Sequence, residues 1–458
     1  MRLVHQFLIV TFVSVWVIVT YIVFWRPETA PGYAHTREED SQYSEFLEKI
    51  IFLEKEVERR NQEYQRLLVK LLVLLEQHSN QLQANQSPEA AGGGTSTTPT
   101  DGVREIPLVD DSPPFSGPVI PVIVFACNRI SISNCLDNLI QYRPNKKQFP
   151  IIVSQDCDDE PTRNVIQSYK QQVSLISQPD QSDIVVPPKD KKFKGYYKIA
   201  RHYGWALNTV FSRGYDYVII VEDDLNVAPD FYEYFLATYP LLKNDSSLWC
   251  VSAWNDNGKV GLIDEAAASL LYRTDFFPGL GWMLTKELWG ELSVKWPKAF
   301  WDDWIRHPEQ RKERSCIRPE ISRTRTFGKI GVSNGLFFEK HLKYIKLSEK
   351  FVPFTKMNMT YLLKTNYDAT FLKHVYELPV VTYEELRRGM VSTKDPIRIQ
   401  YNTKDQYKKT TKMLGLMDDF KSGVPRTGYH GIVSFFYNNQ RVYLAPNRNW
   451  KGYDLSWS

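Results

Sequence analysis

The chain has 458 residues, about three domains' worth at roughly 150 residues per domain. Apolar residues make up 43% and charged residues 24%, which is typical of a protein with a packed core and excludes disorder throughout. The 57 lysines and arginines nearly balance the 53 aspartates and glutamates, so the net charge of +4 does not indicate a nucleic-acid-binding protein. In an oxidising compartment, five cysteines would leave at least one thiol free or intermolecular.

Residues 7–25 form an uncharged, mostly apolar segment between Arg2 and Arg26. A helix of this length spans roughly 28 Å, close to the hydrocarbon thickness of a bilayer. A cleaved signal peptide is the alternative, but its apolar stretch is usually shorter and ends in small residues. We therefore expect a cytoplasmic tail at residues 1–6, an uncleaved signal anchor at 7–25 and a lumenal remainder.

Residues 26–118 have the features of a stem. Residues 44–78 show a seven-residue repeat, with apolar side chains at a positions Ile50, Val57, Tyr64 and Leu71 and at d positions Phe46, Leu53, Leu67 and Leu74, and with Arg60 as the one polar d residue. The heptads predict a coiled coil and self-association through it, or else one amphipathic helix lying on its own globular domain. Residues 79–118 are rich in Gly, Ser, Thr and Pro, which predicts a flexible linker.

The globular part begins with alternating strands and helices. β-Branched runs at residues 119–125, 149–154 and 215–221 predict buried strands, and residues 131–141, 161–171 and 196–211 predict helices. This spacing favours parallel βαβ units, in which ligands bind at the carboxyl ends of the strands.

Three acids, Glu222, Asp223 and Asp224, follow the strand at 215–221. Carboxylates clustered beside an apolar strand need a cation or hydrogen-bond donors. Hard oxygen ligands suit Mg²⁺ or Mn²⁺, and such an ion completes its coordination with water and substrate phosphates. The triplet therefore predicts a metal-diphosphate site for a nucleotide sugar; the alternative is an exposed acidic turn.

A second acidic pair lies between tryptophans at residues 298–306, KAFWDDWIR. Aromatic faces pack on pyranose rings, and a carboxylate accepts a hydroxyl proton, so this segment predicts a sugar-binding surface with a base. The alternative is a helix start with Asp302 or Asp303 as N-cap and the tryptophans in the core.

Several motifs together resemble one family, that of N-acetylglucosaminyltransferase I. They are Cys127-Asn128-Arg129, Ser154-Gln155-Asp156-Cys157, Ala200-Arg201-His202-Tyr203, Val221-Glu222-Asp223-Asp224, Pro278-Gly279-Leu280-Gly281-Trp282 and Trp301-Asp302-Asp303-Trp304. Residues 352–356, 417–426, 431–433 and 452–457 match as well. The resemblance covers residues 119–458, and we do not expect it to extend into the stem.

The resemblance implies a GT-A fold, with an α/β catalytic domain at residues 119–328, a linker and donor loop at 329–341 and a smaller α+β domain at 342–458. It implies an inverting, Mn²⁺-dependent transfer of GlcNAc from UDP-GlcNAc. The acceptor would be the 2-hydroxyl of the α1,3-linked mannose of Man5GlcNAc2 on glycoproteins, in the Golgi membrane. That step starts hybrid and complex N-glycans.

The resemblance also implies roles for single residues. Asp224 would bind Mn²⁺, Asp223 the ribose and Glu222 the donor sugar. Further contacts to UDP would come from Arg129, Asp156, His202 and Ser333.

At the sugar, Asp302 would be the catalytic base, with Trp301 and Leu280 lining the pocket. A base separate from the metal ligand fits inversion, which needs a proton acceptor on the face opposite the leaving group.

The resemblance also implies how the cysteines pair in disulfides. The family pattern pairs Cys127 with Cys157 and Cys250 with Cys316, and it leaves Cys135 as a buried thiol in the first helix. Bridges suit a lumenal protein, as do sequons at Asn85, Asn244 and Asn358.

Two other functions remain open. A related enzyme with O-linked mannose as acceptor would share the donor site and differ at the acceptor surface. An inactive Golgi lectin or tether would have no need for both a metal site and a base.

Overall fold

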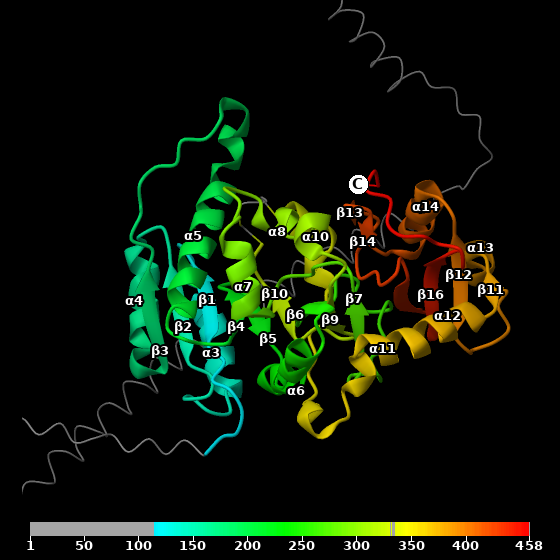
Figure 1. The fold of residues 1–458 in the computed structure, drawn as a ribbon, viewed down its shortest axis with the longest axis horizontal. Coiled ribbons are helices and arrows are strands. Elements are labelled where there is room, and N and C mark those ends of the chain that lie inside the picture. Colours follow the sequence, from blue (N-terminus) through cyan, green and yellow to red (C-terminus); the bar gives the residue numbers. More distant parts are fainter. Residues whose placement is uncertain (1–113, 330, 332–334, 458) are drawn as a thin grey trace, which may run out of the picture. The chain divides into compact units, whose positions relative to one another are not determined.

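A computed structural model describes residues 114–329, 331 and 335–457 (Figure 1). The predicted tail, signal anchor and coiled coil, the linker up to residue 113, the sequon at Asn85 and Ser333 lie outside the described residues. Within them, no helix combines the length and the apolar character that crossing a membrane requires.

The three predicted strands form at one end of a sheet. They are β1 (Val122–Ala126), β2 (Ile151–Gln155) and β4 (Tyr217–Glu222), and β1 pairs in parallel with both of the others. A strand that the sequence analysis missed, β3 (Val173–Ser177), pairs in parallel with β2. Parallel βαβ units are therefore confirmed for this end.

The rest of the sheet is mixed, because β4 pairs antiparallel with the next strand. In the described part of the chain the sheet has eight strands, in the order β3-β2-β1-β4-β8-β6-β9-β7. The remaining bounds are β8 (Trp282–Thr285), β6 (Leu248–Ser252), β9 (Ser315–Pro319) and β7 (Leu271–Thr274).

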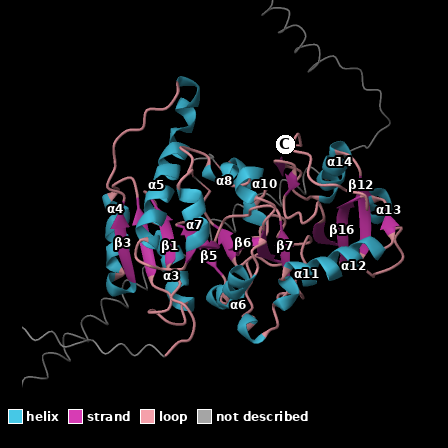
Figure 2. Cartoon of the chain, viewed as in Figure 1, coloured by secondary structure: helices cyan, strands magenta, loops and turns pink. Residues whose placement is uncertain are grey.

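Helices cover both faces of this sheet (Figure 2). Alternate strand residues point to opposite faces, and in β1 the side chains on both faces are buried. Val122 and Val124 pack in one core with α3 and α6, and Ile123 and Phe125 pack in the other with α5 and α7. The helices are α3 (Ile132–Tyr142), α4 (Glu160–Ser168), α5 (Lys194–Phe211), α6 (Phe231–Asn244) and α7 (Lys286–Ser293). The helices predicted at 131–141, 161–171 and 196–211 are α3, α4 and α5.

A smaller sheet lies within residues 342–458, the predicted C-terminal domain. Its strand order is β11-β12-β16-β15, and it has its own core, which includes Ile397, Tyr407 and Val442. The strands are β11 (Val380–Val381), β12 (Ile397–Tyr401), β15 (Val433–Tyr437) and β16 (Gln440–Pro446). The helices are α11 (Lys364–Tyr367), α12 (Lys373–Glu377), α13 (Tyr383–Arg387) and α14 (Lys404–Leu414).

Both disulfides implied by the resemblance are present. Cys127 is bonded to Cys157 and Cys250 to Cys316, with Cα atoms 5.2 Å and 4.6 Å apart. Cys135 is the free, buried cysteine of the described chain, as expected. The sequon residues Asn244 and Asn358 are exposed, so their positions permit glycosylation.

A buried ion pair joins α6 to the later part of the chain. Arg323 donates from Nη2 to Asp230 Oδ2 at 3.0 Å, and neither side chain is exposed. The same carboxylate accepts from the backbone N–H of Val352 at 3.3 Å, and the guanidinium also donates to the carbonyl oxygens of Ile321 and Ala268. Burial raises the pKa of Asp230, and Arg323 opposes that shift.

We expect Arg323→Met to lower the free energy of unfolding by about 3–5 kcal/mol, since it leaves the Asp230 carboxylate buried without its cation. Adding Asp230→Asn to that variant should recover part of the loss. Urea unfolding of the two single variants and the double variant measures the coupling. Lys373→Ala, which removes the exposed pair with Glu377, is the control and should change little. Additive losses in the cycle would contradict the coupling.

Candidate active site

The carboxyl ends of β1, β2 and β4 bring the first group of predicted site residues to one edge of the sheet. The backbone N–H of Asp156 donates to the carbonyl of Ala126 at 2.9 Å, and that of Asp223 donates to the carbonyl of Phe125 at 3.0 Å. The Cys127–Cys157 bridge links the segments that follow β1 and β2. Backbone pairing and a covalent bond therefore fix this edge before any ligand binds.

Arg129 is the cation next to the acidic triplet. Its Nε donates to Asp223 Oδ1 at 3.0 Å, and its Nη2 lies 3.4 Å from Asp224 Oδ2. The two aspartate side chains are only 13% and 17% exposed. Burial raises the pKa of Asp223 to about 6 despite the opposing charge of Arg129. The alternative of an exposed acidic turn is therefore wrong.

Glu222 points toward a buried tyrosine on α5. Tyr203 donates its hydroxyl to Glu222 Oε1 at 3.0 Å. Burial, followed by the negative charge of Asp224, raises the pKa of Glu222 to about 8, and Asp302 contributes to the same shift. The acid triplet and the predicted base are thus close enough to interact electrostatically.

His202 lies beneath this edge rather than on the surface. It is 5% exposed, and its Nε2 is 2.8 Å from Ser154 Oγ on β2. Burial lowers its pKa to about 4, although Asp156 opposes the shift. His202 is therefore neutral at pH 7. Asp156 is buried too and accepts a hydrogen bond from Gln181 Nε2 at 3.0 Å.

The predicted base is on α8 (Trp301–Trp304), a helix of four residues. Its N-cap is Phe300, in a left-handed conformation with φ +52° and without a side-chain cap, so the alternative of Asp302 or Asp303 as N-cap is wrong. The Asp302 side chain is 48% exposed. Arg306 Nη1 lies 3.3 Å from Asp302 Oδ2 and 3.2 Å from Asp303 Oδ1.

Trp301 belongs to the core under α8. It is 7% exposed, and the rings of Tyr203, Trp282 and Trp296 stack on it with centroids 4.6, 6.1 and 5.8 Å away. For Trp301 the structure thus agrees with the alternative that placed the tryptophans in the core, because other aromatic rings pack on it. Trp301 instead connects the two groups of acids through Tyr203, whose ring stacks on Trp301 and whose hydroxyl donates to Glu222.

Leu280 lies in a tight loop before β8. Its φ is +50°, and the flanking Gly279 and Gly281 have φ of +70° and +89°. Thr324 Oγ1 donates to the Leu280 carbonyl at 2.6 Å, and a Cβ on Gly281 would lie 2.5 Å from Thr324 Cγ2. Gly281 therefore lets this loop approach β10 (Thr324–Thr326) closely.

Comparisons with known proteins agree with this geometry. A family model described as the GNT-I family matches residues 16–457. The chain belongs to the GNT-I family. The alpha-1,3-mannosyl-glycoprotein 2-beta-N-acetylglucosaminyltransferase of Arabidopsis thaliana is 39% identical over 332 residues, covering 72% of this chain and 74% of that protein. The family match includes the heptads, so the expectation that the resemblance stops short of the stem is wrong.

Solved structures with similar regions are also glycosyltransferases. The mannosyltransferase of Pyrobaculum calidifontis in complex with GDP-Man and Mn²⁺ is 19% identical, with a TM-score of 0.27 over 38% of this chain and 46% of that one. Glucosyl-3-phosphoglycerate synthase of Mycobacterium tuberculosis with Mn²⁺, UDP and glucosyl-3-phosphoglycerate is 15% identical, with a TM-score of 0.25 over 38% and 58%. TM-scores this low do not establish a shared fold.

The acid cluster of this GNT-I family member has the chemistry for one divalent cation. No group of three or more His, Cys, Asp and Glu side chains is arranged as a ligand set within the described ranges. A single carboxylate, completed by water and substrate phosphates, is nevertheless a common way to hold Mg²⁺ or Mn²⁺. Buried carboxylates with raised pKa values, here Asp223 and Asp224, are stabilised in their charged form by such an ion.

Three residues without a predicted role shape the site. Arg306 is four residues after Asp302, the helical spacing for an ion pair, so the sequence held a signal for it. Tyr203 lies within a motif used for the resemblance. Gly328 gave no signal, yet a Cβ there would lie 1.9 Å from Asp224 Oδ2, so a side chain larger than hydrogen would displace that carboxylate.

We expect the burial of His202 to make stability depend on pH. Its folded pKa is about 4 and the ordinary value is 6.5, so its contribution is complete above pH 6.5 and is lost as the pH falls toward 4. The loss should reach about 3 kcal/mol. Urea unfolding at pH 7 and 4.5 should show a smaller loss in His202→Gln than in the wild type.

His374→Gln is the matched control, because that histidine is exposed. It should lose as much stability as the wild type on acidification. An equal loss in His202→Gln would contradict the neutral, buried state of His202.

Proposed function

We propose that this chain transfers GlcNAc from UDP-GlcNAc, with inversion, to the 2-hydroxyl of the α1,3-linked mannose of Man5GlcNAc2 N-glycans. Membership of the GNT-I family and the name of the Arabidopsis relative support the N-acetylglucosaminyltransferase I activity. The observation that carries the assignment is Tyr203, whose hydroxyl contacts Glu222 and whose ring stacks on Trp301, next to Asp302. One buried side chain thus joins a cluster suited to a metal diphosphate with a separate carboxylate.

In the proposed GT-A-type donor site, Asp224 would hold Mn²⁺ and Asp223 the ribose. Glu222 would face the donor sugar, and the remaining UDP contacts would come from Arg129, Asp156, His202 and Ser333. A bound Mn²⁺ supplies charge neutralisation for the leaving diphosphate. Neutral His202 offers a hydrogen bond without charge, and the raised pKa of Glu222 lets it donate one while protonated.

At the acceptor, Asp302 accepts the proton of the mannose 2-hydroxyl. The hydroxyl oxygen bonds to the anomeric carbon of GlcNAc, and the bond from that carbon to the diphosphate oxygen breaks, so UDP leaves with the electron pair. Arg306 Nη1 lies 3.3 Å from the Asp302 carboxylate and orients it. The Asp302 side chain is 48% exposed, which leaves it accessible to a substrate. A base on the face opposite the leaving group gives the β-linked product.

The placement of the enzyme is part of the proposal. Residues 7–25 would anchor it in the Golgi membrane with its catalytic part in the lumen, and the heptads would associate copies of the stem. Two disulfides fit an oxidising compartment.

The assay offers two acceptors to residues 107–458, the range that contains the compact unit. Metal-dependent transfer from UDP-GlcNAc to a Man5GlcNAc2 glycopeptide supports the proposal. Transfer to O-mannosyl peptides alone would favour the related enzyme. Binding of glycan without turnover would indicate a lectin.

We expect Asp302→Asn to lower kcat by about 100- to 10,000-fold, because a positioned base is lost. UDP affinity in the presence of Mn²⁺ should stay at the wild-type level, as measured by calorimetry. Asp405→Asn, an exposed aspartate on α14, is the matched control. Wild-type turnover in Asp302→Asn would show that another group takes the proton.

Asp224→Ala should instead weaken Mn²⁺-dependent UDP binding at least about tenfold, or about 1.4 kcal/mol, since the metal loses its protein ligand. Titration of UDP with and without Mn²⁺ measures the effect. The difference between the two conditions should shrink in the variant. If Mn²⁺ enhances UDP binding in Asp224→Ala as much as in the wild type, the ion is held elsewhere.

A further inference from the structure

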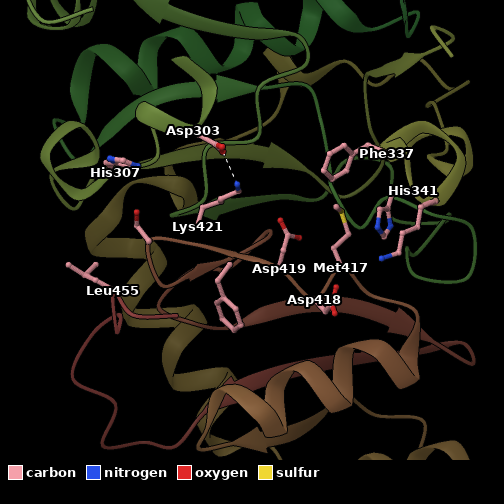
Figure 3. Close-up of a pocket in the computed structure, with 12 residues that line it drawn as sticks. Asp303, His307, Phe337, His341, Met417, Asp418, Asp419, Lys421 and Leu455 are labelled. Carbon is pink, nitrogen blue, oxygen red and sulfur yellow. Dashed lines mark ion pairs between the residues drawn. The ribbon is translucent and has the colours of Figure 1, made fainter. Parts of the chain in front are cut away.

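A pocket of about 510 Å³ lies beside α8, and no predicted residue role accounts for it. Figure 3 shows the ion pair of Asp303 and Lys421 on one side of the pocket and Phe337 and His341 on another. Asp303 follows the proposed base in sequence, and Lys421 comes from the C-terminal part of the chain. The volume is within the range of pockets that bind small ligands.

A rigid hairpin presents Lys421 to the pocket. β13 (Phe420–Lys421) pairs antiparallel with β14 (Val424–Pro425) across Ser422 and Gly423, whose φ values of +48° and +79° make a tight two-residue turn. Phe420 is buried in the C-terminal core, so the neighbouring Lys421 side chain points the other way. A Cβ on Gly423 would lie 2.5 Å from the carbonyl oxygen of Asp454, so only glycine lets the turn pack this closely on the C-terminal segment.

The pocket is linked to the proposed base through Asp303 and Arg306. Lys421 Nζ lies 2.9 Å from Asp303 Oδ1, and the same oxygen is 3.2 Å from Arg306 Nη1. Arg306 Nη1 also contacts Asp302. Burial raises the pKa of Asp303, but Lys421 and Arg306 outweigh it and lower the pKa below its ordinary value. An occupant bound at Lys421 therefore lies next to Asp302.

The charges of the lining indicate a neutral ligand with many hydroxyls. Three aspartates and two lysines face the pocket, so it has no excess of positive charge for a diphosphate. Asp419 is already paired with Arg426, whereas Asp418 has no ion pair or side-chain hydrogen bond in the described part of the chain. Lys421 has three N–H donors and one carboxylate partner among the described residues. Phe337, 52% exposed, adds an apolar surface of the kind that packs on sugar rings.

We propose that this pocket binds the mannose residues of the acceptor glycan, with Lys421 donating to their hydroxyls and Asp418 accepting from them. The inference rests on the proposed function and adds to it: the C-terminal part of the chain recognises the acceptor. The reacting mannose lies at the rim beside Asp302, and its neighbours in the glycan lie against Lys421 and Asp418.

Calorimetry tests binding apart from turnover, with free Man5GlcNAc2 glycan added to the enzyme in the presence of UDP and Mn²⁺. We expect Lys421→Ala to weaken glycan binding and to raise the KM for the Man5GlcNAc2 glycopeptide, each at least tenfold. UDP affinity should stay at the wild-type level. Lys412→Ala, an exposed lysine on α14, is the matched control and should change none of these.

Asp418→Asn, a nearly isosteric change, provides a second variant if Lys421→Ala unfolds. It should raise the Kd for the free glycan and the KM for the glycopeptide about fivefold each. Acceptor constants within twofold of the wild type in the folded variants would overturn the pocket assignment. Absence of glycan binding to the wild type would overturn it as well. Glycan binding that depends on Lys421, without transfer in the wild type, would overturn the proposed function and leave the pocket standing.

Discussion

The burial of negative charge at the end of β4 is the constraint on which the site depends. Three carboxylates follow a strand whose residues 217–221 are buried, and Arg129 is the cation that contacts two of them. Desolvation raises the pKa of each acid. In the proposed function a cation and a diphosphate would complete this site, while the Cys127–Cys157 bridge and the parallel pairing of β1 keep the edge in place.

A second constraint is the aromatic core beneath α8. A helix of four residues is too short to be stable alone, so its position is set by what it packs on. Trp301 is enclosed by Tyr203, Trp282 and Trp296, which come from α5, β8 and the segment after α7. The exposed Asp302 is thus held by a buried neighbour on one side and by Arg306 on the other.

The sequence predicted the strands β1, β2 and β4 and the helices α3, α4 and α5, because buried parallel strands are continuous apolar runs that alternate with helices. It missed β3, which is an edge strand with partly exposed residues. The two groups of acids were found from their positions after a buried strand and between tryptophans, whereas the disulfide pairing and the role of each acid followed from the resemblance. The sequence left open whether Trp301 lies on the surface or in the core, because a motif does not reveal which parts of a ring are covered. Gly328 and Lys421 lie far from their partners in sequence, so only the folded chain brings them to Asp224 and Asp303.

Phe276 joins the two parts of the chain at one point. The guanidinium of Arg306 lies 4.9 Å from the centroid of its ring and that of Arg426 lies 4.8 Å away. Arg306 orients the acids of α8, and Arg426 pairs with Asp256 and Asp419. The helix α8 and the segment that carries Arg426 are therefore coupled through one aromatic ring. Replacing Phe276 with a smaller side chain would remove a contact of both guanidinium groups at once, so a change at this one ring would affect the acids of α8 and the partners of Arg426 together.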